Sequence, residues 1–418
     1  MPFATRLRCP RCGATQPPEL PSFEGCLACS ADGHAVNLVC DVPIDHELAK
    51  EALLEPAHKS MWDFAPLLPV DAGEKVDLGE GWTPLLPLSA TGRDIGVPGL
   101  WGKNESANPT WSHKDRLCAV SLTAARHLGA NAIGAVSTGN HGASVAAYAA
   151  RAGLRSVIFT LQAVPQAMKA LIGAYGSLVV AAPSVEVRNA LMNEAVAEFG
   201  LYPVSNFIKP PIGSSPFGVD GYKTIAYEIW HQLEGEIPDW VCVPVGYGDC
   251  LSGVARGFQD LVDLGVAPRV PRLIAAEVFG AVGAAMTGTA MPRSGEPDST
   301  SAFSIATTMA TDQSLRALRA TDGVACTVDE SDIRAAQRML GGHEGIFAEA
   351  SSAAAVAAIA KLAAEGTIGS ADTVVALVTS TGLKDPVGAT AWEEPVVDVT
   401  EVADLAVILS RVLGPHPR

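Results

Sequence analysis

From about residue 100 to residue 378, short apolar segments alternate with longer helical ones, and this pattern limits the possible folds most. Short strands separated by helices form βαβ units, whose strands run parallel. Alanine, glycine and valine dominate the composition, as expected for parallel strands covered by helices on both faces. The sequence therefore predicts an α/β protein. The expected strands are 132–136, 156–160, 178–181, 240–245, 273–277 and 373–378; the expected helices are 142–151, 166–175, 186–199, 252–264 and 346–365.

At 418 residues, the chain is long enough for two or three domains. We expect two parallel-sheet lobes preceded by a small metal-ribbon segment. A stretch rich in glycine, threonine, serine and proline, residues 280–301, predicts a loop. The expected divisions are a zinc-ribbon-like segment over 1–45, a connector and the first part of the body over 46–99 (helical and proline-punctuated to about residue 69), a smaller lobe over 100–210 and a larger lobe over 211–418.

Four cysteines near the N-terminus form two C-x2-C pairs separated by 13 residues: Cys9, Cys12, Cys26 and Cys29. Two such pairs can supply four thiolates to one zinc ion. Four protein ligands leave no open position, so this zinc would be structural. The alternative is four free or redox-active thiols.

The charge, the hydropathy and the cysteine content of the chain argue against several classes of protein. A formal net charge of -16 disfavours nucleic-acid binding, which needs a basic surface. No apolar run is long enough to cross a bilayer, and no targeting signal is visible at the N-terminus. Nine cysteines in a chain of this size do not indicate a secreted disulfide scaffold. We therefore expect a cytoplasmic protein with no membrane or nucleic-acid partner.

Three segments carry candidate chemistry. Lys114 follows an N-P-T-W-S-H sequence that cannot continue a helix, and a lysine at such a junction can form a Schiff base with an aldehyde cofactor. The S-T-G-N-H-G sequence at 137–142 follows a strand and offers hydroxyl, amide and backbone N–H groups. The glycine-rich sequence at 244–253 suits a phosphate. Each also has a plain interpretation, namely a surface lysine, an asparagine-capped turn and a glycine-rich turn without dinucleotide-binding spacing.

Together these segments resemble the fold-type II pyridoxal-phosphate enzymes (tryptophan synthase β-like), and within them the threonine synthase family. The likeness runs from the G-E-G-W-T-P-L motif at 79–85 to the T-G-L-K-D motif at 381–385, in the family's order. It implies pyridoxal phosphate carried by Lys114. It further implies that Asn140 binds the pyridine 3-hydroxyl, that Ser137, Thr138 and His141 close on the substrate carboxylate, that Gly246, Tyr247, Gly248, Asp249 and Cys250 hold the phosphate, and that Thr379 faces the pyridine nitrogen.

The chain departs from the family near its substrate motifs. Trp111 and His113 replace the usual glycine and phenylalanine beside the cofactor lysine. Gly218 stands where threonine synthases carry an arginine that helps to hold the substrate phosphate. The sequence offers Lys169, Lys209 or Lys223 as a substitute cation, and Trp111 as an apolar wall for a different leaving group.

The resemblance therefore predicts a lyase that abstracts the α-proton of an amino acid and expels a γ- or β-leaving group. Threonine synthase-like replacement ranks first. The alternative is a β-eliminating dehydratase or a β-replacement synthase, such as a cysteate synthase-like enzyme, acting on a hydroxy or O-phospho amino acid. We expect a homodimer. Two other classes stay open: a silent ligand-sensing relative, which would be expected to lose Lys114 or Asn140, and a zinc-ribbon nucleic-acid binder, which the acidic charge disfavours.

Overall fold

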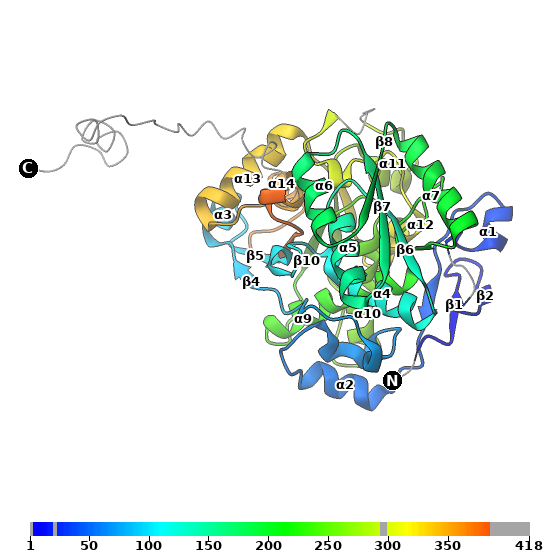
Figure 1. Ribbon diagram of the computed structural model, residues 1–418. Helices are drawn as coiled ribbons and strands as arrows, with labels where there is room; N and C mark the ends of the chain where they lie inside the picture. The colour runs from blue at the N-terminus through cyan, green and yellow to red at the C-terminus, as the bar shows by residue number, and fades with distance from the viewer. Residues whose placement is uncertain (1–2, 20–22, 293–298, 385–418) are drawn as a thin grey trace, which may run out of the picture.

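The computed structural model describes residues 3–19, 23–292 and 299–384 and contains two parallel sheets and one small antiparallel sheet (Figure 1). The larger sheet has the strand order β12-β11-β10-β13-β5-β4, and only the edge strand β4 runs antiparallel to its neighbour. The smaller sheet has the order β8-β7-β6-β9 and is parallel throughout. This confirms the predicted α/β architecture.

The expected strands and helices are confirmed within a few residues at their ends. The structure also contains strands at 202–203 and 324–327 and helices at 312–320 and 330–344, which the sequence did not predict. The strands are β6 (Ala132–Val136), β7 (Arg155–Leu161), β8 (Leu178–Ala182), β9 (Tyr202–Pro203), β10 (Trp240–Pro244), β11 (Arg272–Glu277), β12 (Val324–Thr327) and β13 (Thr373–Val378). The helices that cover them include α5 (Asn140–Ala152), α6 (Gln166–Ala174), α7 (Val185–Phe199), α10 (Asp249–Asp263), α12 (Asp312–Ala320), α13 (Glu330–Glu344) and α14 (Ala350–Ala364).

Helix α14 begins four residues later than the sequence indicated. Ala348 instead forms an isolated bridge with Thr381, a long-range contact that local sequence does not reveal. The expected loop at 280–301 also begins with a helix, α11 (Ala281–Thr287). Its first-turn N–H groups at Val282 and Gly283 donate to the side chain of Glu277, at the end of the preceding strand. Residues 293–298 of that stretch lie outside the described residues.

Strand β5 (Gly99–Asn104) belongs to the larger sheet, although the expected boundary at residue 100 places it in the smaller lobe. It pairs along its whole length with β13, so that Gly99 lies beside Thr373 and Asn104 beside Val378. The edge strand β4 (Leu85–Pro87) pairs with β5 in turn. The pairing of β5 with β13 joins segments that are far apart in the sequence, which a local pattern cannot predict.

The N-terminal segment forms the antiparallel sheet β2-β1-β3, made of β1 (Arg6–Arg8), β2 (Thr15–Gln16) and β3 (Val39–Asp41), with helix α1 (Leu27–Ala31). It packs directly on the body. The rings of Phe3 and Phe217 lie 5.4 Å apart, and Asn37 donates to the carbonyl of Ser214 at 3.0 Å. The connector contains α2 (His46–Leu54) and the 3-10 helix Met61–Leu67, followed later by α3 (Ser89–Asp94).

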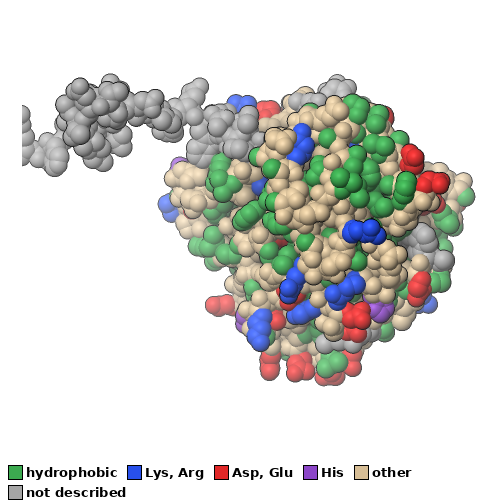
Figure 2. All heavy atoms as spheres, viewed as in Figure 1, with side chains coloured by type: hydrophobic (Ala, Val, Ile, Leu, Met, Phe, Trp, Pro, Cys, Tyr) green, Lys and Arg blue, Asp and Glu red, His purple; other side chains and the backbone are tan. Residues whose placement is uncertain are grey.

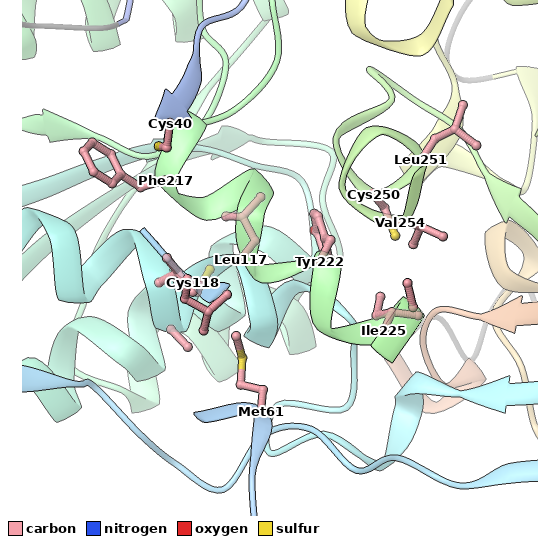
Figure 3. Packing of buried hydrophobic residues seen from close by; sticks show 14 of the residues in the cluster. Cys40, Met61, Leu117, Cys118, Phe217, Tyr222, Ile225, Cys250, Leu251 and Val254 are labelled. Carbon is pink, nitrogen blue, oxygen red and sulfur yellow. The ribbon is translucent and has the colours of Figure 1, made fainter. Parts of the chain in front are cut away.

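A shared apolar core joins the connector to α4 (Lys114–His127), α8 (Pro216–Gly221), α9 (Lys223–Gln232) and α10 (Figure 3). Met61, Leu117, Phe217 and Leu251 are completely buried there. This core places the start of α4, and therefore Lys114, against the larger lobe.

On the surface, acidic side chains gather along the lower edge of the molecule, over α2 (Figure 2). Within the described parts of the chain, we find no helix with the length and apolar character needed to cross a membrane.

Candidate active site and metal centre

A cavity of about 510 Å³ lies between the two parallel sheets, at the carboxyl ends of β6, β10 and β13. Ligands in open α/β proteins bind at this end of the strands. The volume lies in the range typical of small-molecule sites. The cavity is lined by all eleven residues assigned to cofactor or substrate: Lys114, Ser137, Thr138, Asn140, His141, Gly246, Tyr247, Gly248, Asp249, Cys250 and Thr379.

Lys114 is the first residue of α4, and its Nζ lies 5.7 Å from the ring centroid of Tyr222. The turn before it is held by Asp115, which accepts hydrogen bonds from the backbone N–H of Thr110 at 2.6 Å and from Ser144 Oγ at 2.6 Å. Burial raises the pKa of Asp115. These contacts fix the direction in which the lysine leaves the helix.

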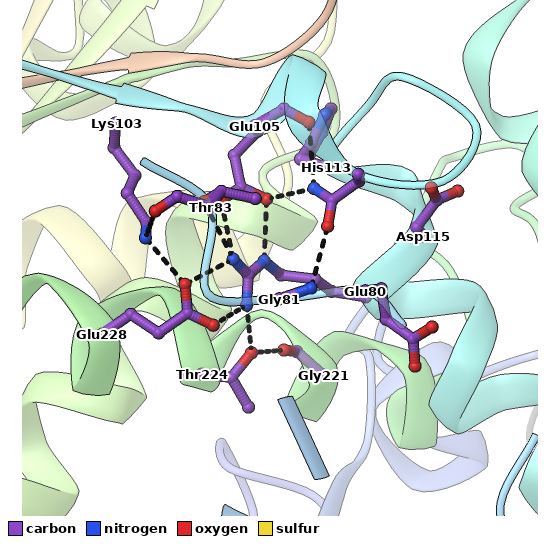
Figure 4. A network of polar contacts seen from close by, with 12 residues as sticks. Glu80, Gly81, Thr83, Lys103, Glu105, His113, Asp115, Gly221, Thr224 and Glu228 are labelled. Atoms are coloured by element: carbon purple, nitrogen blue, oxygen red, sulfur yellow. Dashed lines mark hydrogen bonds and ion pairs between the residues drawn. The ribbon is translucent and has the colours of Figure 1, made fainter. Parts of the chain in front are cut away.

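A completely buried ionic network lies beside this turn (Figure 4). Arg116 binds Glu105 at 2.7 Å and Glu228 at 2.5 Å, and Lys103 binds Glu228 at 2.7 Å. Two cations and two carboxylates balance, as a buried network requires. Burial disfavours the charge on Arg116, but the two carboxylates outweigh this effect and raise its pKa. The network ties α4 to β5 and α9 immediately after Lys114.

The Asn140 side chain is held by groups that the sequence interpretation missed. Its Nδ2 donates to both carboxylate oxygens of Glu349, at 3.1 and 2.9 Å. Its Oδ1 accepts from Lys384 Nζ at 2.9 Å and from Ser380 Oγ at 3.1 Å. Because a lysine can only donate and a carboxylate can only accept, these contacts determine which way the amide faces. Lys384 stands in the T-G-L-K-D motif at 381–385, which is the one sequence signal that could have found it; Asp385 lies outside the described residues.

The loop before α5 offers hydrogen-bond donors to an anion. Ser137 Oγ accepts from the N–H groups of Gly139 at 3.2 Å and Gly142 at 2.8 Å, which shapes the loop. Gly139, the N-cap residue of α5, has no side chain to cap the helix, so the N–H groups of Asn140 and His141 remain available. In the described structure, Nε2 of His141 is buried without a hydrogen-bond partner. Burial lowers the pKa of His141 to about 3, so the imidazole is neutral.

The glycine-rich loop leads into α10, which also lacks a side-chain cap. Gly248 has φ +77°, a conformation that favours glycine, and a Cβ there would lie 2.6 Å from Ser314 Cβ. The carboxylate of Asp249 forms its hydrogen bonds with neighbouring protein groups. It accepts from Ser214 N at 3.0 Å and Ser214 Oγ at 2.7 Å, and from Gln313 Nε2 at 2.6 Å. Backbone N–H groups, rather than the Asp249 side chain, are therefore the donors at this end.

Thr379 follows β13, and its hydroxyl lies 2.8 Å from Ser352 Oγ. Its carbonyl accepts from the backbone N–H of His113 at 2.9 Å. The His113 ring stacks on Tyr222 with ring centroids 5.4 Å apart, and burial lowers its pKa well below the usual range. Neutral hydroxyl and imidazole groups thus surround this side of the cavity.

The structure corrects three expectations about the substrate region. Gly218 is a helix-packing position, because a Cβ there would overlap Ser121 Oγ and lie 2.8 Å from Leu117 Cγ in α4. It does not line the cavity, and neither does Trp111, whose side chain is exposed.

Of the three proposed substitute lysines, only Lys209 lines the cavity. Lys169 is exposed and donates to the carbonyl of Gln162, whereas Lys223 is buried and pairs with Asp260 at 2.6 Å. Among the described residues, Arg188 in α7 also lines the cavity beside Lys114 and Lys209, and the sequence interpretation missed it.

The four N-terminal cysteines converge, with all four Sγ atoms within 4.8 Å of one another. Cys9 Sγ lies 3.6 Å from Cys29 Sγ, and Cys12 Sγ lies 3.6 Å from Cys26 Sγ. Cys9 Sγ also accepts from the N–H group of Arg11 at 3.4 Å. Such N–H donors stabilise thiolates, so this cluster can hold a metal ion.

The family model described as "Pyridoxal-phosphate dependent enzyme" matches residues 76–380. The threonine synthase of Methanocaldococcus jannaschii is 32% identical over 401 residues, which cover 93% of this chain and 95% of that protein. The threonine synthase of Methanosarcina acetivorans is 32% identical over 409 residues, 94% of each chain.

Solved structures share the fold. The processed form of threonine deaminase isoform 2 from Solanum lycopersicum superposes with a TM-score of 0.62 at 20% identity, covering 78% of this chain and 82% of that one. A fungal L-serine ammonia-lyase from Rhizomucor miehei superposes with a TM-score of 0.62 at 22% identity, covering 75% of this chain and 98% of that one.

Proposed function

This chain belongs to the family of pyridoxal-phosphate dependent enzymes, and from this premise we propose that it binds the cofactor at Lys114 and removes an oxygen-linked leaving group from an amino acid. One observation carries the proposal. Lys114, Asn140, the loop at 246–250 and Thr379 come from four distant parts of the chain and line one cavity.

The residues present fit the cofactor. Lys114 supplies a primary amine, and Asn140 supplies an amide for the ring oxygen. The uncapped N-terminus of α10 supplies N–H groups for a phosphate. Thr379 supplies a hydroxyl, which would not enforce a protonated pyridine nitrogen as a carboxylate would.

Pyridoxal phosphate, when bound, accepts the electrons left at the substrate Cα after proton removal. Lys114 Nζ would act as the general base for that proton. The N–H groups at the start of α5 and the hydroxyls of Ser137 and Thr138 would hold the substrate carboxylate. Neutral His141 adds a hydrogen-bonding group at the same wall without adding charge.

Threonine synthase-like replacement is the first candidate reaction, because the threonine synthase relatives match 93–94% of this chain. In that reaction, O-phosphohomoserine and water give threonine and inorganic phosphate. β-Elimination is the second candidate. It is favoured by His141, since the S-T-G-N-H sequence is similar to dehydratases, and by the packing role of Gly218, which leaves no room for the family's arginine.

A substrate screen tests the proposal. The purified holoenzyme is incubated with O-phosphohomoserine, O-phosphoserine, threonine or serine, and released phosphate, ammonia, keto acid and threonine are measured. Threonine with equimolar phosphate supports replacement, whereas keto acid with ammonia supports elimination. Absence of both types of product from every substrate contradicts the proposed function.

We further propose that the cysteine cluster holds structural zinc, because four thiolates suit that ion and leave no open position. A cytoplasmic location is supported by the nine cysteines, none of which forms a disulfide in the structure. The expected homodimer remains part of this proposal, to be tested by measuring the mass of the protein in solution.

A further inference from the structure

Arg188 is a cavity-lining cation with no acidic partner in the part of the chain that the structure describes. It lies in the first turn of α7 and is partly buried. Its Nε and Nη2 donate to the neighbouring Asn189 side chain at 3.2 Å, and no carboxylate among the described residues forms an ion pair with it. A partly desolvated guanidinium in the wall of a cavity is stabilised when an anion binds beside it.

The place of Arg188 suggests which anion it meets. Helix α7 packs on the smaller sheet, whereas Tyr247 follows β10 of the larger sheet. Arg188 and Tyr247 both line the cavity. Arg188 therefore lies where the two lobes meet at the cavity. The backbone N–H groups at the start of α10 already suit the cofactor phosphate, which leaves the guanidinium for a second anion.

Among the described residues of the larger lobe, no arginine lines the cavity. Gly218 is closed off by α4, and among the described cavity-lining residues the other cations are Lys114 and Lys209. Lys114 has its own role, and Lys209 is highly exposed and lies 3.6 Å from Glu186. An exposed, flexible ammonium contributes little, whereas a guanidinium can bind an oxyanion through two parallel hydrogen bonds.

We propose that Arg188 recognises an oxyanion on the substrate side chain and so selects phosphorylated or otherwise acidic amino acids over neutral ones. This inference rests on the proposed function, because it concerns the substrate of the same cavity. It assigns to the smaller lobe the recognition that the sequence comparison places at position 218.

The test uses the holoenzyme and its variants Arg188→Gln and Arg188→Lys. Lys209→Gln is the matched control, because it removes the positive charge of another residue that lines the cavity. Binding of O-phosphohomoserine, O-phosphoserine, homoserine and serine is followed through the cofactor absorption spectrum. Arg188→Gln is expected to weaken the two phosphorylated ligands about 10- to 150-fold. It should change the affinity for the two neutral ligands less than about 2-fold. Arg188→Lys should recover part of the loss, because it keeps the charge but not the paired geometry.

Three results would overturn the inference. Equal weakening of phosphorylated and neutral ligands would show a general structural role. Loss of bound cofactor in Arg188→Gln would assign the arginine to the cofactor phosphate. A comparable selective loss in Lys209→Gln, with Arg188→Gln unaffected, would move the recognition to the lysine. Failure of the proposed function itself is distinct, because the unaltered holoenzyme would then respond to none of the four amino acids.

Discussion

Lys384 Nζ lies 2.9 Å from Oδ1 of Asn140, while the amide nitrogen of the same asparagine faces Glu349. The lysine therefore orients the amide that we assign to the cofactor ring oxygen. Burial lowers the pKa of Lys384 to about 8, and Glu349 partly opposes this effect. A positioning residue with a pKa near neutrality makes the site sensitive to pH.

The first prediction follows from that pKa. Between about pH 8 and 10.5 the unfolded chain binds more protons at Lys384 than the folded chain does, so its contribution to stability rises with pH. Below pH 8 both states are protonated and the cost of burying the charge is complete. Unfolding of cofactor-free protein and of Lys384→Met is compared from pH 7.5 to 10. The free energy of unfolding of the unaltered protein, minus that of Lys384→Met, should rise with pH by at most about 1.4 kcal/mol per pH unit. A difference that is constant or falls with pH contradicts the assignment.

The second prediction concerns Gly218. Gly218→Arg would force α8 away from Ser121 and Leu117 and should lower the free energy of unfolding by about 1–3 kcal/mol or more. It should not improve binding of a phosphorylated substrate, because the position does not line the cavity. Gly342→Arg is the matched control: no atom lies within 4 Å of a Cβ built there, and arginine favours helix over glycine by up to about 1 kcal/mol. Gly218→Arg with unchanged stability and tighter phosphate binding would refute the packing role.

The third prediction links the N-terminal metal to the cofactor. Asn37 donates to the carbonyl of Ser214, and Ser214 donates twice to Asp249 in the phosphate loop. Metal analysis should find about one zinc per chain. Cys12→Ser should lose this zinc and bind pyridoxal phosphate more weakly, because the loop loses its support. Cys326→Ser, which changes a buried cysteine outside the cluster, should keep the zinc. A zinc-free protein with unchanged cofactor affinity would show that the two sites are independent.

The sequence predicted the repeating strands and helices well, because buried parallel strands such as β10 and β13 are continuous apolar runs. It did not predict that β5 joins the larger sheet, since that pairing joins residues about 270 positions apart, such as Leu100 and Val374. Side-chain burial likewise cannot be read from one sequence. Gly218 looked like a missing arginine, whereas it is a close contact between α4 and α8.

For the candidate site, motifs at the ends of strands were informative. Ser137, Gly246 and Thr379 each follow a strand, and parallel strands bring their carboxyl ends to one edge. Arg188 and Glu349 carry no such signal. Each lies at the start of a helix in an otherwise ordinary segment, and only the packing of the two lobes places it at the cavity.

The central claim is that Lys114 carries the cofactor, and the most direct test is to identify the modified lysine. The holoenzyme is reduced with borohydride, digested and analysed by peptide mass spectrometry. We predict a pyridoxyl group on Lys114, and no stable modification in Lys114→Ala. Lys209, which lines the same cavity, and Lys384, which contacts Asn140, serve as internal controls. A pyridoxyl group on either of them in the unaltered protein, or a reducible adduct that persists in Lys114→Ala, would contradict the assignment of the site.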